Sequence, residues 1–161
     1  MTSFSQDLYK SKGFTLVELM VTVVVLAIVA TIGIPSFIGL LERNRATASA
    51  NELLGSIQFT RSEAVRLNTT SRICPSNDGT TCSGAWTDGW VVLRGTTDEV
   101  VRVGQENAAV TITGPTEVEF GSAGNVISTV PSGGINFEVT SGGTNRCVSV
   151  FLSGVAEVEG C

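Results

Sequence analysis

Histidine is absent from this chain of 161 residues. Its absence removes the most common general base and the most common zinc ligand of proteins. The sequence also has no glycine-rich phosphate loop ending in Lys-Ser or Lys-Thr, and no convincing pair of nucleophile and base. The net charge is −5, which does not suit the neutralisation of nucleic-acid phosphates. We therefore expect no enzyme activity, no cofactor and no bound metal.

Charge is almost missing from a long segment near the N-terminus. Between Lys12 and Glu42 the only ionisable side chain is Glu18. A charge at the centre of a membrane helix costs roughly 2.5–3.5 kcal/mol, so Glu18 requires a reason even near the start of the segment. Residues 14–41 are long enough to cross a bilayer. Positively charged flanks stay in the cytoplasm, so the lysines before this segment predict a single pass through the membrane, with residues 42–161 facing the periplasm.

The four cysteines all follow the apolar segment, at Cys74, Cys82, Cys147 and Cys161. An even number of cysteines outside the cytoplasm indicates two disulfides, for which three pairings are possible. The pairs Cys74–Cys82 and Cys147–Cys161 are favoured because each closes a short local loop, worth about 2.5–3 kcal/mol in the loop-entropy model. The alternative is a zinc site, but no two cysteines have the Cys-x2–4-Cys spacing of such sites.

Pro35 interrupts the helical pattern of the apolar segment. Proline removes a backbone donor and clashes with the preceding turn, so we expect a helix kink there, with a helix end as the alternative. Apolar residues at helical spacing resume over residues 37–67. This pattern predicts a helix over residues 42–68, whose apolar face within residues 50–67 covers a sheet.

After Asn68 the sequence changes to short β-branched runs separated by turn residues. Apolar and polar residues alternate most clearly at residues 118–120 and 135–139, which indicates antiparallel sheets with one buried face. The predicted fold class is therefore α+β, with a long N-terminal helix packed on an antiparallel β-sheet domain over residues 69–161. The expected strands are 70–74, 90–94, 99–103, 108–113, 116–120, 125–130, 134–139 and 146–152, with a short one near 155–158.

The junction before the apolar segment reads Lys12-Gly13-Phe14-Thr15-Leu16-Val17-Glu18-Leu19. It resembles the class III signal of type IV pilins and type II secretion pseudopilins. The resemblance implies that a prepilin peptidase removes residues 1–13 by cutting between Gly13 and Phe14, after which the Phe14 amine is methylated. It also implies that residues 14–41 remain as the transmembrane and assembly helix, and that Glu18 recruits the subunit by pairing with the terminal amine of a neighbour. A simpler role, compatible with recruitment, is a capping box between Thr15 and Glu18.

A second motif lies around the first two cysteines. Cys74-Pro75-Ser76, followed by Trp86-Thr87-Asp88-Gly89-Trp90, resembles the GspH/FimT family of type IV minor pilins. The resemblance implies a type IV pilin-like fold, with residues 42–161 as the periplasmic GspH/FimT-like domain. It further implies a structural subunit of the priming and tip complex that links other minor pilins to the major pilin. The implied partners are these pilins, the prepilin peptidase and the inner-membrane assembly platform, and the implied final location is the pilus fibre.

Two other functions remain open at this point. A GspH-like pseudopilin of type II secretion would carry the same signals. The DNA-uptake branch of the family typically carries Gly-Arg-x-Arg near its last strand, where this chain has Gly154–Glu159 with two glutamates and no arginine. Arg94, Arg102 and Arg146 could still gather into a patch, but separate solvated arginines are the favoured interpretation. We therefore expect no nucleic acid among the partners.

Overall fold

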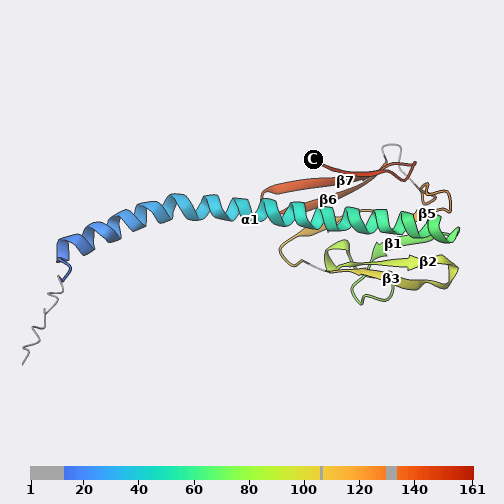
Figure 1. Cartoon of the computed structure of the whole chain (residues 1–161), viewed down its shortest axis with the longest axis horizontal. Coiled ribbons are helices and arrows are strands. Elements are labelled where there is room, and N and C mark those ends of the chain that lie inside the picture. The colour runs from blue at the N-terminus through green and yellow to red at the C-terminus, as the bar shows by residue number, and fades with distance from the viewer. Residues whose placement is uncertain (1–12, 106, 130–133) are drawn as a thin grey trace, which may run out of the picture. The chain divides into compact units, whose positions relative to one another are not determined.

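A computed structural model describes residues 13–105, 107–129 and 134–161. In these residues a single long helix precedes eight strands (Figure 1). The chain divides into two compact units, Met1–Ile38 and Gly39–Cys161. The helix α1 (Leu16–Leu67) contributes to both units, each of which is described by itself.

The N-terminal unit consists of the first part of α1. The Thr15 hydroxyl accepts a hydrogen bond from the Glu18 backbone N–H at 3.2 Å and so caps the helix. The helix continues past Pro35, so the alternative of a helix end at this residue is wrong. The large apolar side chains between Leu16 and Leu40 are exposed, and the mean hydropathy reaches 2.6. By length and composition this helix could cross a membrane.

In the second unit α1 buries one stripe of side chains. The buried positions recur every three or four residues, the spacing of one helix face: Ala46, Ser49, Ala50, Leu53, Ser56, Ile57, Thr60, Glu63 and Ala64. The helix ends at Leu67, where Asn68 adopts a positive φ of 50° and the Thr69 N–H donates to the Ala64 carbonyl. Asparagine tolerates this left-handed conformation better than most residues, which explains the position of the helix end.

The first sheet has the strand order β3-β2-β1-β5, with every neighbour antiparallel. Its strands are β1 (Ser71–Pro75), β2 (Trp90–Arg94), β3 (Glu99–Gly104) and β5 (Val118–Phe120). The second sheet has the order β4-β6-β7-β8 and is also antiparallel. Its strands are β4 (Thr111–Thr113), β6 (Ile135–Ser141), β7 (Thr144–Val150) and β8 (Ala156–Glu159).

One hydrophobic core joins the helix to both sheets. Leu53 and Ile57 of α1 are fully buried together with Phe120 of the first sheet and Phe137 of the second. Figure 1 shows strands of both sheets alongside the C-terminal part of α1. The predicted α+β class, with the helix covering antiparallel sheets, is therefore confirmed.

Two expected strands differ most from the structure, and others have shifted bounds, since β5 begins at Val118 and β7 spans Thr144–Val150. The segment 125–129 forms a single bridge, between Phe120 and Val126, in place of the strand expected at 125–130; residue 130 lies outside the described residues. Val126 donates its N–H to the Leu152 carbonyl, so the segment has short contacts on two sides and no long partner strand. The strand expected at 108–113 begins only at Thr111, because a turn closed by Val110 N–H and the Asn107 carbonyl occupies the residues before it.

Candidate functional site

The residues of the expected processing and assembly signal lie at the start of α1. Phe14 is 81% exposed, and Glu18 is in the first turn of the helix. Only half of the capping box is present in the described residues, because the Thr15 hydroxyl accepts the Glu18 backbone N–H but the Glu18 carboxylate accepts no bond from the Thr15 backbone N–H. Within residues 13–105, 107–129 and 134–161, the carboxylate of Glu18 has neither a hydrogen bond nor an ion pair.

Both disulfides join the cysteine pairs that the sequence analysis favoured because each pair closes a short loop. The structure joins Cys74 to Cys82, with Cα atoms 5.5 Å apart, and Cys147 to Cys161, with Cα atoms 5.2 Å apart. The first bridge closes the loop after β1, and the second attaches the C-terminus to β7. The described residues contain no group of three or more potential metal ligands.

Asp78 organises the first disulfide loop. Its Oδ1 atom accepts the backbone N–H groups of Thr80 and Thr81 at 2.8 Å and the Ser76 hydroxyl at 3.0 Å. Its Oδ2 atom accepts the Thr81 hydroxyl at 2.7 Å. These bonds, the Thr81 and Thr80 backbone N–H groups first, stabilise the carboxylate and hold the pKa of Asp78 well below its ordinary value. The carboxylate thus has a local structural role in shaping the loop.

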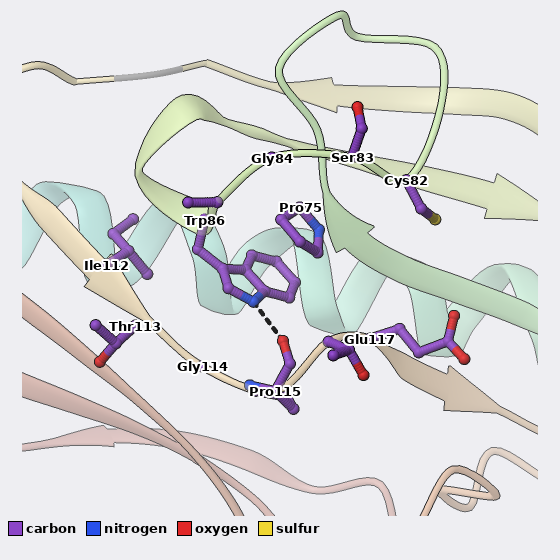
Figure 2. A pocket seen from close by; sticks show the side chains of 12 residues that line it. Pro75, Cys82, Ser83, Gly84, Trp86, Ile112, Thr113, Gly114, Pro115 and Glu117 are labelled. Carbon is purple, nitrogen blue, oxygen red and sulfur yellow. Dashed lines mark hydrogen bonds between the residues drawn. The ribbon is translucent and has the colours of Figure 1, made fainter.

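The same loop forms one wall of a cavity of about 620 Å³, and residues 112–117 form the other (Figure 2). Trp86 also lines the cavity, and its indole N–H donates a hydrogen bond to the Pro115 carbonyl at 2.6 Å. The Trp86 and Phe137 rings pack edge to face, with an interplanar angle of 88° and ring centroids 4.8 Å apart. Trp86 and Trp90 are both buried, so the two tryptophans of the motif are packing residues.

Glu63 is a buried carboxylate surrounded by arginines. Arg66 lies 2.8 Å from it one helical turn later, and Arg94 of β2 lies 3.3 Å from it. The hydrogen bond from Arg66 is the largest cause that lowers the pKa of Glu63, and Arg94 adds to this effect although burial opposes it. The cluster joins the end of α1 to the first sheet.

The lowered pKa of Glu63 predicts a loss of stability in acid. A carboxyl whose pKa is lower in the folded state contributes stability above its unfolded pKa, near 4.5, and loses it as the pH falls through the folded pKa. We expect the melting temperature to decrease with falling pH below about 4.5, and to decrease less steeply in Glu63→Gln. The matched control is Glu52→Gln, an exposed glutamate of the same helix that should keep the wild-type slope. Equal slopes in Glu63→Gln and wild type would contradict the assignment.

The three scattered arginines do not form a set of free cations. Arg94 pairs with Glu63 and Glu99. Arg102 stacks its guanidinium on the Phe59 ring, 5.5 Å from the centroid. Arg146 belongs to the other sheet, where it lies opposite Val139. This arrangement agrees with three separate arginines.

The sequence analysis did not identify a fourth arginine, Arg61, as a residue of interest. Arg61 of α1 donates from Nε to the Gly124 carbonyl at 2.9 Å and from Nη2 to the Ser153 carbonyl at 3.3 Å. These partners are 63 and 92 residues away in the sequence, so no local pattern could have indicated them. The ion pair between Glu63 and Arg66 could have been predicted from the sequence, because oppositely charged residues three positions apart on a helix lie close together.

Comparisons with known families cover both parts of the chain. The family model described as Type II transport protein GspH matches residues 49–154, and the model of the prokaryotic N-terminal methylation motif matches residues 8–34. No curated protein sequence gave a match.

Two crystal structures of the type IV minor pilin FimU from Pseudomonas aeruginosa are similar in fold. One has 20% sequence identity and a TM-score of 0.56, covering 70% of this chain and 91% of that chain. The other has 21% identity and a TM-score of 0.57, covering 74% of this chain and 92% of that chain. At this level of identity the likeness establishes a shared pilin-like fold.

Proposed function

The chain belongs to the GspH family, and from this premise we propose that it is a minor pilin of a type IV pilus. The observation that carries the proposal of a pilin-type subunit is the order of two signals in one chain, and the fold shared with the minor pilin FimU favours the pilus. A methylation motif at residues 8–34 directly precedes a GspH domain at residues 49–154, and a helix long enough to cross a membrane contains most of the first signal. This order suits a subunit that is anchored in the inner membrane before it is assembled.

In this proposal, a prepilin peptidase removes residues 1–13 and a methyl group is added to the new amine of Phe14. Residues 14–41 hold the subunit in the inner membrane, with residues 42–161 in the periplasm. This topology is supported by Lys10 and Lys12, because positive residues beside a membrane helix remain on the cytoplasmic side. The disulfides Cys74–Cys82 and Cys147–Cys161 suit that oxidising compartment.

Glu18 is the proposed assembly residue. Its backbone N–H is satisfied by the Thr15 hydroxyl, and none of the described residues pairs with its carboxylate. An unpaired carboxylate in an apolar environment gains strongly from a positive partner, because the surrounding dielectric constant is low. The terminal amine of Phe14 in a neighbouring subunit provides such a partner. The pair would select the axial register in which one subunit meets the next.

The globular unit then has a connecting role. It belongs to a low-abundance subunit of the priming and tip complex, and it links other minor pilins to the major pilin. Its rigid construction supports this role, because both sheets share one core with α1 and two disulfides hold the loop after β1 and the C-terminus.

Recovery in filaments tests the function directly. We expect wild-type protein in filaments sheared from cells, and a reduction of about tenfold or more for Glu18→Ala at unchanged membrane levels, since losing one buried charge pair costs more than about 1.4 kcal/mol. Glu52→Ala, which removes an exposed glutamate later in α1, should incorporate normally. Normal incorporation of Glu18→Ala would reject the proposed pairing, and absence of the wild-type protein from filaments would reject the minor pilin function.

A pseudopilin of type II secretion is the second candidate, favoured by the description of the matching family as a type II transport protein. Deletion of the gene discriminates between the two. Loss of twitching motility with normal protein secretion supports the pilus, and the reverse result supports the secretion system.

A further inference from the structure

Exposed apolar side chains gather at one place on the globular unit. Val65 of α1, Ile127 of the loop after β5, and Phe151, Leu152 and Val155 of the turn between β7 and β8 are all exposed. The segments that carry them meet near Arg61, which donates to the Gly124 and Ser153 carbonyls, and we call the five residues the Arg61 patch. Exposed apolar patches with a polar rim are typical of protein interaction sites.

Three backbone segments meet at the Arg61 patch. The Val126 N–H donates to the Leu152 carbonyl at 3.0 Å, which joins the loop after β5 to the β7–β8 turn. Gly154 packs against the Gly124 carbonyl so closely that any side chain there would collide with it. A Cβ atom at Gly124 would lie 3.0 Å from Val65, which brings the same loop against α1. The patch is therefore built on contacts that fix its shape.

A cavity of about 600 Å³ opens within the patch, between α1 and the β7–β8 turn. Val65 and Val155 provide apolar walls, and Arg61 and Gln58 provide polar groups. The Arg61 guanidinium donates to two backbone carbonyls, but no carboxylate of the described residues forms an ion pair with it. By contrast, the charge of Arg66 is compensated by Glu63. The cavity thus combines apolar walls with one uncompensated positive charge.

We propose that the Arg61 patch binds the globular domain of a different pilin subunit, which inserts a large apolar side chain beside a carboxylate. This inference rests on the minor pilin function proposed above. The apolar side chain would displace water from between Val65 and Val155, and the carboxylate would compensate the charge of Arg61. Charge complementarity of this kind sets the orientation of two partners and rejects wrong ones.

The charges around the patch argue against other occupants. A second copy of this chain is disfavoured because each copy has a net charge of −5, so that two copies repel. A nucleic acid or an anionic membrane needs several uncompensated cations, whereas Glu157 and Glu159 follow the β7–β8 turn on β8. A partner with one well-placed carboxylate fits both observations.

Site-specific crosslinking in cells that assemble filaments tests the proposal with the full chain. Leu152, 63% exposed, is replaced by the photoreactive amino acid p-benzoylphenylalanine, and the matched control is the same replacement at Val103, 51% exposed on β3 and outside the patch. We expect an adduct at Leu152 at least tenfold above the control, with another protein that carries a prepilin-type methylation signal. A yield equal to the control, or an adduct with a second copy, lipid or DNA, would overturn the proposal.

The charge of the partner is tested by opposite substitutions at Val155, with the crosslinker kept at Leu152. Val155→Glu places a like charge against the partner's carboxylate and should lower the yield about tenfold or more, whereas Val155→Lys should retain it within about threefold. Equal losses in both variants would contradict the acidic partner. Removal of residues 1–13 and recovery in filaments are scored on the same samples, so that a processed and incorporated chain without the adduct refutes the patch alone.

Discussion

Replacing Gly13 with leucine is expected to leave the protein entirely as the uncleaved precursor. The proposed cleavage follows Gly13 directly, and a peptidase that admits glycine at this position brings its own atoms close to the backbone. A leucine side chain would occupy that space. Within the chain itself, a Cβ atom at Gly13 has no neighbour within 4 Å, so the substitution does not disturb the folded protein. The loss would therefore arise in the peptidase complex.

Mass spectrometry of the membrane fraction measures this effect. The wild-type chain should begin at Phe14 and carry one additional methyl group, and Gly13→Leu should retain residues 1–13 without the methyl group. Gly160→Leu is the matched control, since a Cβ atom there also has no neighbour within 4 Å and the residue lies far from the signal. A mature mass for Gly13→Leu, or a wild-type chain that still begins at Met1, would contradict the processing proposal.

Replacing Phe137 with alanine is expected to lower the free energy of unfolding of the globular unit by about 3–5 kcal/mol. Phe137 is fully buried on β6 and meets Trp86 edge to face, with ring centroids 4.8 Å apart. It also packs on Gly114, where any side chain would collide with the Phe137 ring. Truncation leaves a cavity between these neighbours that the rigid, doubly bridged domain cannot easily fill.

Denaturant unfolding of the detergent-solubilised full chain, followed by tryptophan fluorescence, measures the loss at Phe137. Trp86 reports directly, because its ring contacts the substituted side chain. Phe151→Ala removes the same atoms from an exposed position and should cost below about 1 kcal/mol. A similar loss of stability in both variants would show that Phe137 is not the central packing residue described here.

Local patterns predicted most of the fold. The helix over residues 42–68 ends at Leu67, one residue early, and strands such as 90–94 agree with the structure because each has a clear run of apolar or alternating residues bounded by turn signals. The segment 125–130 carried the same type of signal, yet residues 125–129 form only one bridge. A strand needs a partner of similar length, and partner choice depends on contacts distant in the sequence.

The candidate sites likewise divide into those that a local segment predicts and those that distant segments form together. The signal around Gly13 and Glu18 was readable because the proposed cleavage and membrane insertion depend on one short contiguous segment. The cavity lined by Trp86 and the environment of Arg61 were not readable, because their walls come from segments far apart in the chain. Glu63 was intermediate, since its pairing with Arg66 is local whereas its pairing with Arg94 is not.

The sequence by itself determined the anchor, the family motifs and the α+β class, because hydropathy, turn residues and helical spacing are local properties. Only the tertiary structure decided how the domain presents itself to other molecules. It brought Val155 of the β7–β8 turn into one cavity with Val65 and Arg61 of α1, although the turn and the helix are far apart in the sequence. The physical reason is that burial and charge compensation depend on which surfaces meet after folding. The local sequence of each segment does not specify which distant segment it will contact.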